Sequence, residues 1–230
     1  MGAEQPRVET RAADVLAGID RARAEIDVLE HPFYERWSAG LLSAADLARY
    51  AQQYRHAVVA LAHASALAAR RAGPAHAHHL REHAREESEH VALWDRFAQA
   101  TRERLAGTRE MSAPALAQTR ACADAWRQGE HLLDHLAVLY AIEAAQPAVS
   151  RTKLEGLVTH YGYAPRAHAV EYFRVHATRD REHARQARAL IAALLARSDN
   201  AGFSPSRLIE RARAALAGNW SLLDGVQARA

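Results

Sequence analysis

The feature that most constrains this fold is the spacing of apolar residues, which recur every three or four positions over long stretches of the chain. Side chains at this spacing share one face of an α-helix. Only 11 Gly and 7 Pro occur among 230 residues, so few positions oppose helix formation. We therefore predict an all-α fold of about seven to eight helices, without strands.

Glycine, proline and capping residues divide this pattern into segments. Ser43 with Asp46 is typical of a capping box, and a Gly-Pro pair separates two long helices. We expect helices at residues 10–30, 43–71, 74–105, 115–127, 130–146, 150–161, 166–197 and 205–223. A short aromatic element is expected at 33–37.

Nothing in the sequence divides the chain into separate domains. Hydrophobic residues make up 49%, enough for a full core, and no fixed-period repeat or low-complexity linker occurs. We expect one helical domain over residues 1–230, with flexible ends at about 1–9 and 224–230.

Charge and cysteine content argue against several classes of protein. No stretch approaches the ~20 uncharged apolar residues of a membrane span, and charges throughout residues 1–23 leave no signal-peptide core. The formal charge is only +3 and no basic run with interleaved aromatics occurs, so we expect no nucleic-acid partner. The single cysteine, Cys122, rules out an intrachain disulfide and is typical of the reducing cytosol.

The segment from His176 to His183 combines three potential metal ligands on one helix. Asp180 lies four residues after His176 and three before His183, so the three side chains fall within about 60° around the helix. The same face continues through Leu190 and should point into the core. Two buried imidazoles and a carboxylate need a strong partner, and a metal ion provides one.

The helix expected at 74–105 adds a carboxylate and an imidazole. Glu87 lies on its apolar face and His90 beside it, with His83 on the same flank. Glu86 lies about 100° from the centre of that face, so periodicity favours Glu87 over Glu86 as the inward carboxylate.

Glu143 places a third carboxylate at a core position, because it shares a helix face with Leu132, Leu136 and Leu139. Burying three carboxylates without cations would be costly. Two transition-metal ions, held by carboxylates and imidazoles from facing helices, resolve that cost. Oxygen and nitrogen ligands without thiolate favour iron or manganese over zinc. Each residue alone is typical of a satisfied core or surface position, but their combination on three core faces favours a metal site.

At these residues the chain resembles the haem-oxygenase-like di-metal oxidases and oxygenases, which are related in fold to the pyrroloquinoline-quinone synthesis oxidase and thiaminase families. The resemblance covers almost the whole chain and rests on EESEH at 86–90, LYAIE at 139–143, QP at 146–147, KLEGL at 153–157, YG at 161–162 and YFRVH at 172–176. It implies a haem-oxygenase-like bundle with six metal ligands: Glu87 (or Glu86), His90, Glu143, His176, Asp180 and His183. Some members separate the first glutamate from its histidine by seven residues, whereas here the spacing is three or four.

Within this family the chain is most similar to the chlamydial protein associating with death domains and its bacterial relatives, which resemble self-sacrificing para-aminobenzoate synthases. In that branch a tyrosine of the protein supplies the ring and a lysine the amine, which implies Tyr34 and Lys153 as catalytic residues. Lys153 is the only lysine in the chain, and an arginine could not act as a neutral amine. A departure is Ile142, where that branch can carry an aromatic residue. If that aromatic relays electrons, this chain must use others, such as Tyr50, Tyr140 or Tyr172.

We weigh three functions. The first is a dioxygen-activating di-metal oxygenase, with Fe/Fe or Mn/Fe, that forms para-aminobenzoate from Tyr34 and Lys153. The second is a di-iron oxidase or oxygenase acting on a bound small molecule such as a fatty acid or amino acid. The third is a metal-free ligand-binding or interaction protein. For the enzyme hypotheses we expect dioxygen as co-substrate, an external reductant, a cytoplasmic location and, from the family, a homodimer.

Overall fold

The computed structural model describes residues 4–105, 115–197 and 204–228. In these ranges it contains nine α-helices, two 3-10 helices and no strand. The helices are α1 (Glu4–Glu25), α2 (Pro32–Ser38), α3 (Ala44–Arg71), α4 (Pro74–Glu103), α5 (Ala117–Arg127), α6 (Leu132–Glu143), α7 (Gln146–Thr159), α8 (Glu171–Leu195) and α9 (Pro205–Gln227), with η1 at Val28–Glu30 and η2 at His168–Val170. The predicted all-α class is confirmed: the longer helices match those expected, and the short aromatic element forms α2.

Two helix boundaries differ from the prediction because local chemistry overrides the apolar pattern. α1 ends at Glu25, and Asp27 then caps η1 by accepting the Leu29 N–H at 2.9 Å. α6 and α7 are separated only at residues 144–145, because Pro147 fits the first turn of α7. In a first turn the missing N–H of proline has no helical partner to lose.

The start of α8 and both ends of the chain also differ. α8 begins at Glu171, later than predicted, and follows the 3-10 helix η2. Within the expected flexible ends, residues 4–9 and 224–227 are helical. Residues 1–3 and 229–230 lie outside the described residues.

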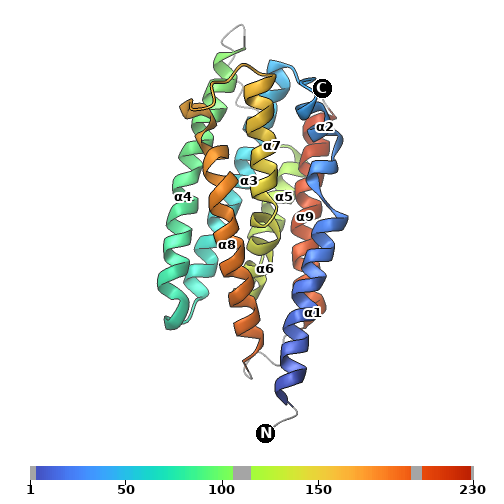
Figure 1. Cartoon of the computed structure of the whole chain (residues 1–230), viewed down its shortest axis with the longest axis vertical. Coiled ribbons are helices and arrows are strands. Elements are labelled where there is room, and N and C mark those ends of the chain that lie inside the picture. The colour runs from blue at the N-terminus through green and yellow to red at the C-terminus, as the bar shows by residue number, and fades with distance from the viewer. Residues whose placement is uncertain (1–3, 106–114, 198–203, 229–230) are drawn as a thin grey trace.

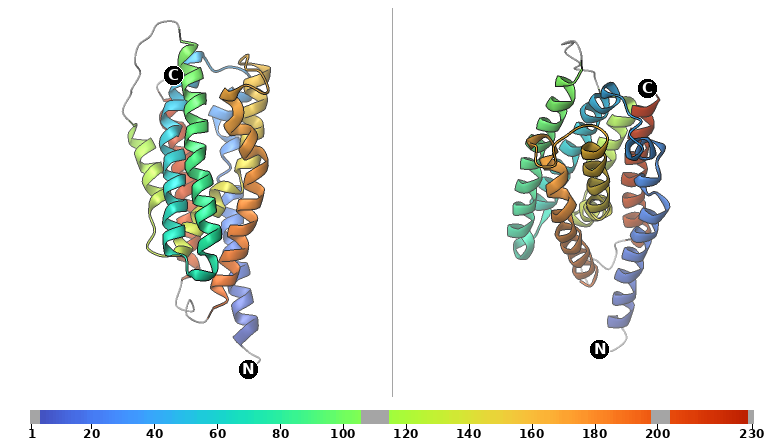
Figure 2. Two further views of the ribbon diagram at one scale, coloured as in Figure 1. Left: turned by 90° about the vertical axis from the view of Figure 1, so that its left-hand side faces the viewer. Right: turned by 45° about the horizontal axis from the view of Figure 1, so that its top comes forward.

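The long helices run side by side along the long axis of the molecule (Figure 1). α3 packs along α4, α6 and α7 pack along α8, and α1 pairs with α9. Figure 2 shows α5 on the side of the bundle opposite α8. Because α8 contacts both α4 and α6, the three helices with the predicted metal ligands meet in the bundle.

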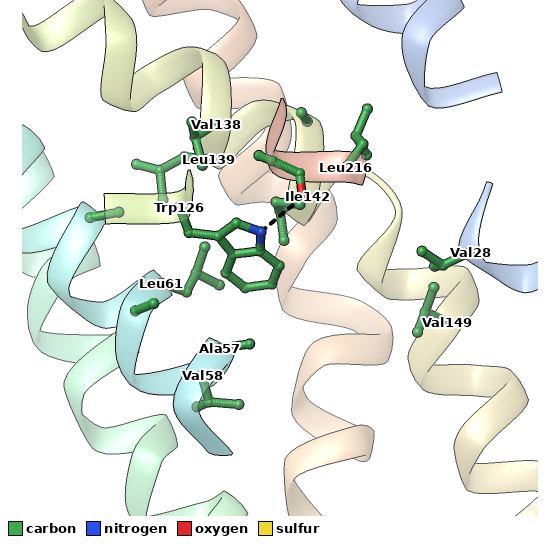
Figure 3. Packing of buried hydrophobic residues seen from close by; sticks show 14 of the residues in the cluster. Val28, Ala57, Val58, Leu61, Trp126, Val138, Leu139, Ile142, Val149 and Leu216 are labelled. Carbon is green, nitrogen blue, oxygen red and sulfur yellow. Dashed lines mark hydrogen bonds between the residues drawn. The ribbon is translucent and has the colours of Figure 1, made fainter. Parts of the chain in front are cut away.

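Aromatic and aliphatic side chains fill the interior around these helices. Trp126 of α5 is buried between Leu61 and Ile142, and its indole N–H donates to the Ala215 carbonyl at 3.0 Å (Figure 3). Pairing this polar atom lets the whole indole be buried without an unsatisfied donor. Among the described residues, no helix is both long and apolar enough to cross a membrane.

Candidate metal centre

The face of α4 that carries the predicted ligands points into the bundle. Glu87 is 1% exposed, and His83 and His90 are each 6% exposed. Steps of four and three residues place these side chains within about 60° of one another around the helix. The position of Glu87 confirms the orientation that apolar periodicity indicated.

α6 and α8 bring the remaining predicted ligands against this face. Glu143 from α6 and His176, Asp180 and His183 from α8 are all buried. The rings of His176 and His90 have centroids 4.4 Å apart, so imidazoles from α8 and α4 meet directly.

Two groups of ligand atoms form among the described residues, each with all atoms within 4.8 Å of one another. The first group is His83, Glu87, Glu143 and His183, and the second is Glu87, His90 and His176. Because Glu87 belongs to both groups, its carboxylate would contribute to holding an ion at either one. His83 was not among the predicted ligands, although its spacing of four residues from Glu87 was a signal for it.

Five buried polar atoms at this centre have no hydrogen-bond partner: His83 Nε2, His176 Nε2, His183 Nδ1 and both carboxylate oxygens of Glu143. Leaving a buried polar atom unpaired costs about 1–3 kcal/mol. A cation would satisfy these lone pairs together, since neutral imidazoles and carboxylates both donate electron pairs to metals. The residues therefore fit the metal centre that the sequence indicated, and their nitrogen and oxygen donors suit iron or manganese.

Asp180 lies beside the two groups and not within them. Its carboxylate is 2.7 Å from His176 Nδ1, which leaves Nε2 of that ring to face the centre. It also lies 3.9 Å from His183 Nδ1. A carboxylate in this position fixes the orientation of a ligand histidine and raises its basicity.

The structure separates the roles of the two adjacent glutamates. Glu86 is half-buried and accepts from Arg179 at 2.8 Å and from His183 Nε2 at 3.1 Å. Its hydrogen bond with His183 leaves Nδ1 of that ring for the centre. Glu87, not Glu86, is the carboxylate inside the ligand groups.

Opposing effects act on the charges of the buried groups. Burial raises the pKa of Glu143. Burial also acts to raise the pKa of Glu87, but the hydrogen bond with His90 and the charge on His176 outweigh it and hold that pKa below its usual range. For His176, burial lowers the pKa but the adjacent Asp180 carboxylate raises it more. The centre can thus hold protons that a bound metal ion would displace.

Lys153 is completely buried in α7, and its Nζ has no hydrogen-bond partner. Aromatic rings surround the amine: its Nζ is 4.5 Å from the ring centroid of Tyr54, 5.4 Å from that of Tyr50 and 5.7 Å from that of Tyr34. Burial lowers the pKa of Lys153 from 10.5 to about 7. The structure therefore brings the predicted catalytic lysine and tyrosine into one aromatic cluster.

Tyr34 is held in this cluster by the start of α2. His31 caps that helix by accepting the Phe33 N–H at 3.0 Å, and Pro32 occupies its first turn. The buried Tyr34 hydroxyl lies 3.4 Å from that of Tyr50. Burial raises the pKa of Tyr34 well above its ordinary value, so the phenol stays protonated.

The aromatic cluster continues to the metal-facing histidines. Ring centroids are 5.9 Å apart between Tyr50 and Trp94, 4.8 Å between Trp94 and Tyr172, and 4.1 Å between Tyr172 and His176. Contiguous rings therefore join the surroundings of Tyr34 to the candidate metal centre.

Of the tyrosines considered in place of an aromatic at Ile142, Tyr140 lies elsewhere. Its hydroxyl donates to Asp20 at 2.6 Å and contacts Arg188. Tyr50 and Tyr172 remain the candidates within the cluster.

Comparison with known proteins gives relatives over most of the chain. Residues 48–218 match the family described as iron-containing redox enzymes. A protein from Chlamydia muridarum named 4-aminobenzoate synthase is 33% identical over 182 residues, covering 75% of each chain. A protein of the same name from Nitrosomonas europaea is 29% identical over 223 residues, covering 86% of this chain and 85% of the relative.

Solved structures with this arrangement of helices are also known. A TenA homologue from Pseudomonas syringae pv. tomato matches with a TM-score of 0.73 at 17% identity, over 94% of this chain and 92% of its own. A domain of unknown function with a heme oxygenase-like fold, from Shewanella denitrificans, matches with a TM-score of 0.72 at 16% identity, over 91% of this chain and 90% of its own. At these identities the likeness concerns the fold alone.

Proposed function

The chain belongs to the family of iron-containing redox enzymes and has a haem-oxygenase-like fold, and on this premise we propose that it activates dioxygen at a two-metal centre and forms 4-aminobenzoate from its own Tyr34 and Lys153. Two of its relatives are named 4-aminobenzoate synthase. The observation that carries the proposal is the burial of Tyr34 and the only lysine of the chain in one aromatic cluster.

The metal ions would be held by side chains that converge between α4, α6 and α8. The residues proposed to hold them are Glu87, His90, Glu143, His176 and His183, with Asp180, the sixth predicted ligand, beside them against His176. Bound iron, or iron with manganese, supplies the redox chemistry that dioxygen needs. The unpaired atoms of Glu143, His176 and His183 support this assignment.

Lys153 is suited to supply the nitrogen. Because burial lowers its pKa to about 7, a large fraction of the amine is neutral at neutral pH and carries a free lone pair. Its backbone is fixed by the Trp37 indole N–H, which donates to the Lys153 carbonyl at 3.2 Å. An arginine at this position would remain charged and could not take this role.

Tyr34 is suited to supply the ring. Its phenol keeps its proton, and its ring faces the amine of Lys153 inside walls that exclude water. The hydroxyl contact with Tyr50 gives the phenol proton a neighbouring oxygen.

Mass spectrometry tests the proposal directly. We expect that loading with Fe²⁺, followed by dioxygen and a reductant, releases 4-aminobenzoate and changes the mass of the peptides carrying Tyr34 and Lys153. The peptide carrying Tyr140, whose hydroxyl donates to Asp20 outside the aromatic cluster, serves as the unchanged internal control. Lys153→Arg should release no 4-aminobenzoate; normal release by this variant, or release without a mass change at Tyr34, would refute the self-substrate reaction.

The second hypothesis, oxidation of a bound small molecule, keeps the same metal ligands but gives Tyr34 and Lys153 no part in the reaction. It predicts repeated turnover with no mass change in the protein, so the same experiment separates the two. The third hypothesis predicts that the protein takes up neither iron nor manganese, which elemental analysis measures. The external reductant and the cytoplasmic location remain predictions from the sequence, and the homodimer remains a prediction from the family resemblance.

A further inference from the structure

We propose that His83 is itself a metal ligand, the fourth protein ligand of one ion together with Glu87, Glu143 and His183. This inference rests on the proposed two-metal function and adds a residue to the six ligands expected from the family. His83 lies one turn before Glu87 on α4, on the face that points into the bundle.

The separations around His83 match those of atoms that share one ion. His83 Nε2 lies 2.9 Å from Glu143 Oε1 and 3.9 Å from Glu87 Oε1. His183 Nδ1 lies 3.8 Å from the same Glu87 oxygen. An ion with bonds of about 2.1 Å holds its ligand atoms between about 3.0 and 4.2 Å apart, depending on the coordination geometry. All three separations agree with this range to about 0.1 Å.

The short contact between His83 and Glu143 is not aligned as a hydrogen bond. Nε2 of His83 and both oxygens of Glu143 are left without a hydrogen-bond partner despite their proximity. A histidine that served only to pair with Glu143 would aim its N–H at a carboxylate oxygen. Donor atoms that lie close together without pointing at one another are what a cation between them requires.

His183 approaches the same position from the opposite helix. The rings of His83 and His183 have centroids 4.2 Å apart, which joins α4 to α8 at this ion. Glu86 accepts from His183 Nε2 and so leaves Nδ1 of that ring for the metal. The first ligand group therefore offers two imidazoles and two carboxylates, a complete set for a four-coordinate ion or most of a six-coordinate one.

Cobalt(II) titration of the metal-free protein measures this role without any enzymatic assay. Each bound imidazole that keeps its second N–H gives a paramagnetically shifted, solvent-exchangeable proton signal. For the wild type we expect two cobalt ions per chain and four such signals, from His83, His90, His176 and His183. His83→Gln should lose one signal and bind the corresponding ion at least about 100-fold more weakly. His79→Gln is the matched control, because His79 is exposed one turn earlier on the same helix.

Each outcome decides between the possibilities. If the wild type binds two ions and His83→Gln keeps both at unchanged affinity with every signal, His83 is not a ligand, while the proposed function stands. If the wild type binds no cobalt, iron or manganese, the proposed function itself fails. Should circular dichroism show that His83→Gln does not fold, the wild-type count decides: four shifted signals support the assignment, and three overturn it.

Discussion

Lys153 offers the most quantitative test of the structure, because its burial lowers the pKa from 10.5 to about 7. Its Nζ has no hydrogen-bond acceptor, so the charged amine would lose its hydration without replacement. The difference between the two pKa values corresponds to about 5 kcal/mol against the charged form. Lys153→Met removes this cost while filling a similar volume.

The pH dependence of folding stability follows from the pH at which the folded and the unfolded chain each release the Lys153 proton. The unfolded chain keeps the Lys153 proton up to about pH 10.5, whereas the folded chain releases it near pH 7. Between these values the unfolded state binds more protons, so the stability of the wild type rises with pH. Relative to the wild type, we expect Lys153→Met to be more stable by about 4 kcal/mol at pH 7 and by about 1 kcal/mol at pH 10, with a constant packing difference added at every pH.

Two measurements on the metal-free protein check these values. Urea denaturation of the wild type and Lys153→Met at pH 7, 8, 9 and 10 gives the free energy of unfolding of each protein, and so the difference between them at each pH. Labelling the Cε carbon of lysine gives a single NMR signal, because Lys153 is the only lysine, and we expect its titration midpoint near pH 7. Arg151→Met is the control: Arg151 is exposed on the same helix and stays charged, so its effect should not vary with pH.

A midpoint near pH 10, or a stability difference that stays constant from pH 7 to pH 10, would refute the reasoning. Either result would mean that water or an acceptor reaches the Lys153 amine in solution. The role of Lys153 as a neutral nucleophile at neutral pH would then have no physical basis.

Glu87→Gln should prevent binding of at least one metal ion, whereas Glu86→Gln should retain both ions with about 10-fold weaker affinity, because only Glu87 belongs to both ligand groups. Elemental analysis after dialysis measures the metal content of each variant, and an equal loss of metal in both would contradict this assignment. Gly156→Ala should lower the free energy of unfolding by about 1–3 kcal/mol, measured by urea denaturation, because the added Cβ would lie 2.5 Å from Trp37 Nε1. An unchanged free energy of unfolding would show that the Trp37 indole can move away from this position. Cys122 should react with a thiol reagent only after unfolding, because it is fully buried and burial raises the pKa of its thiol. Rapid reaction of the native protein would contradict the burial of Cys122.

Much of the fold and part of the site could be predicted from local patterns. Helical periodicity needs only the spacing of residues along one segment, so the helices and the inward side of Glu87 were correctly predicted. Boundaries were less certain, because caps such as Asp27 depend on individual hydrogen bonds that apolar spacing does not describe. Whether the predicted ligands bind metal stays a prediction that the titrations above test.

The sequence by itself determined that three carboxylates and several imidazoles lie on the inward faces of helices, and it showed a solitary lysine without placing it in the interior. Only the tertiary structure decided which of these groups meet. The packing of α4 against α8 and of α6 against α8 brings His83 to Glu143 and places Glu86 outside the centre. The packing of α2, α3 and α7 encloses Lys153 beside Tyr34. The physical reason is that helix periodicity assigns a side chain to a face, whereas distances between side chains on different helices depend on how the whole bundle packs.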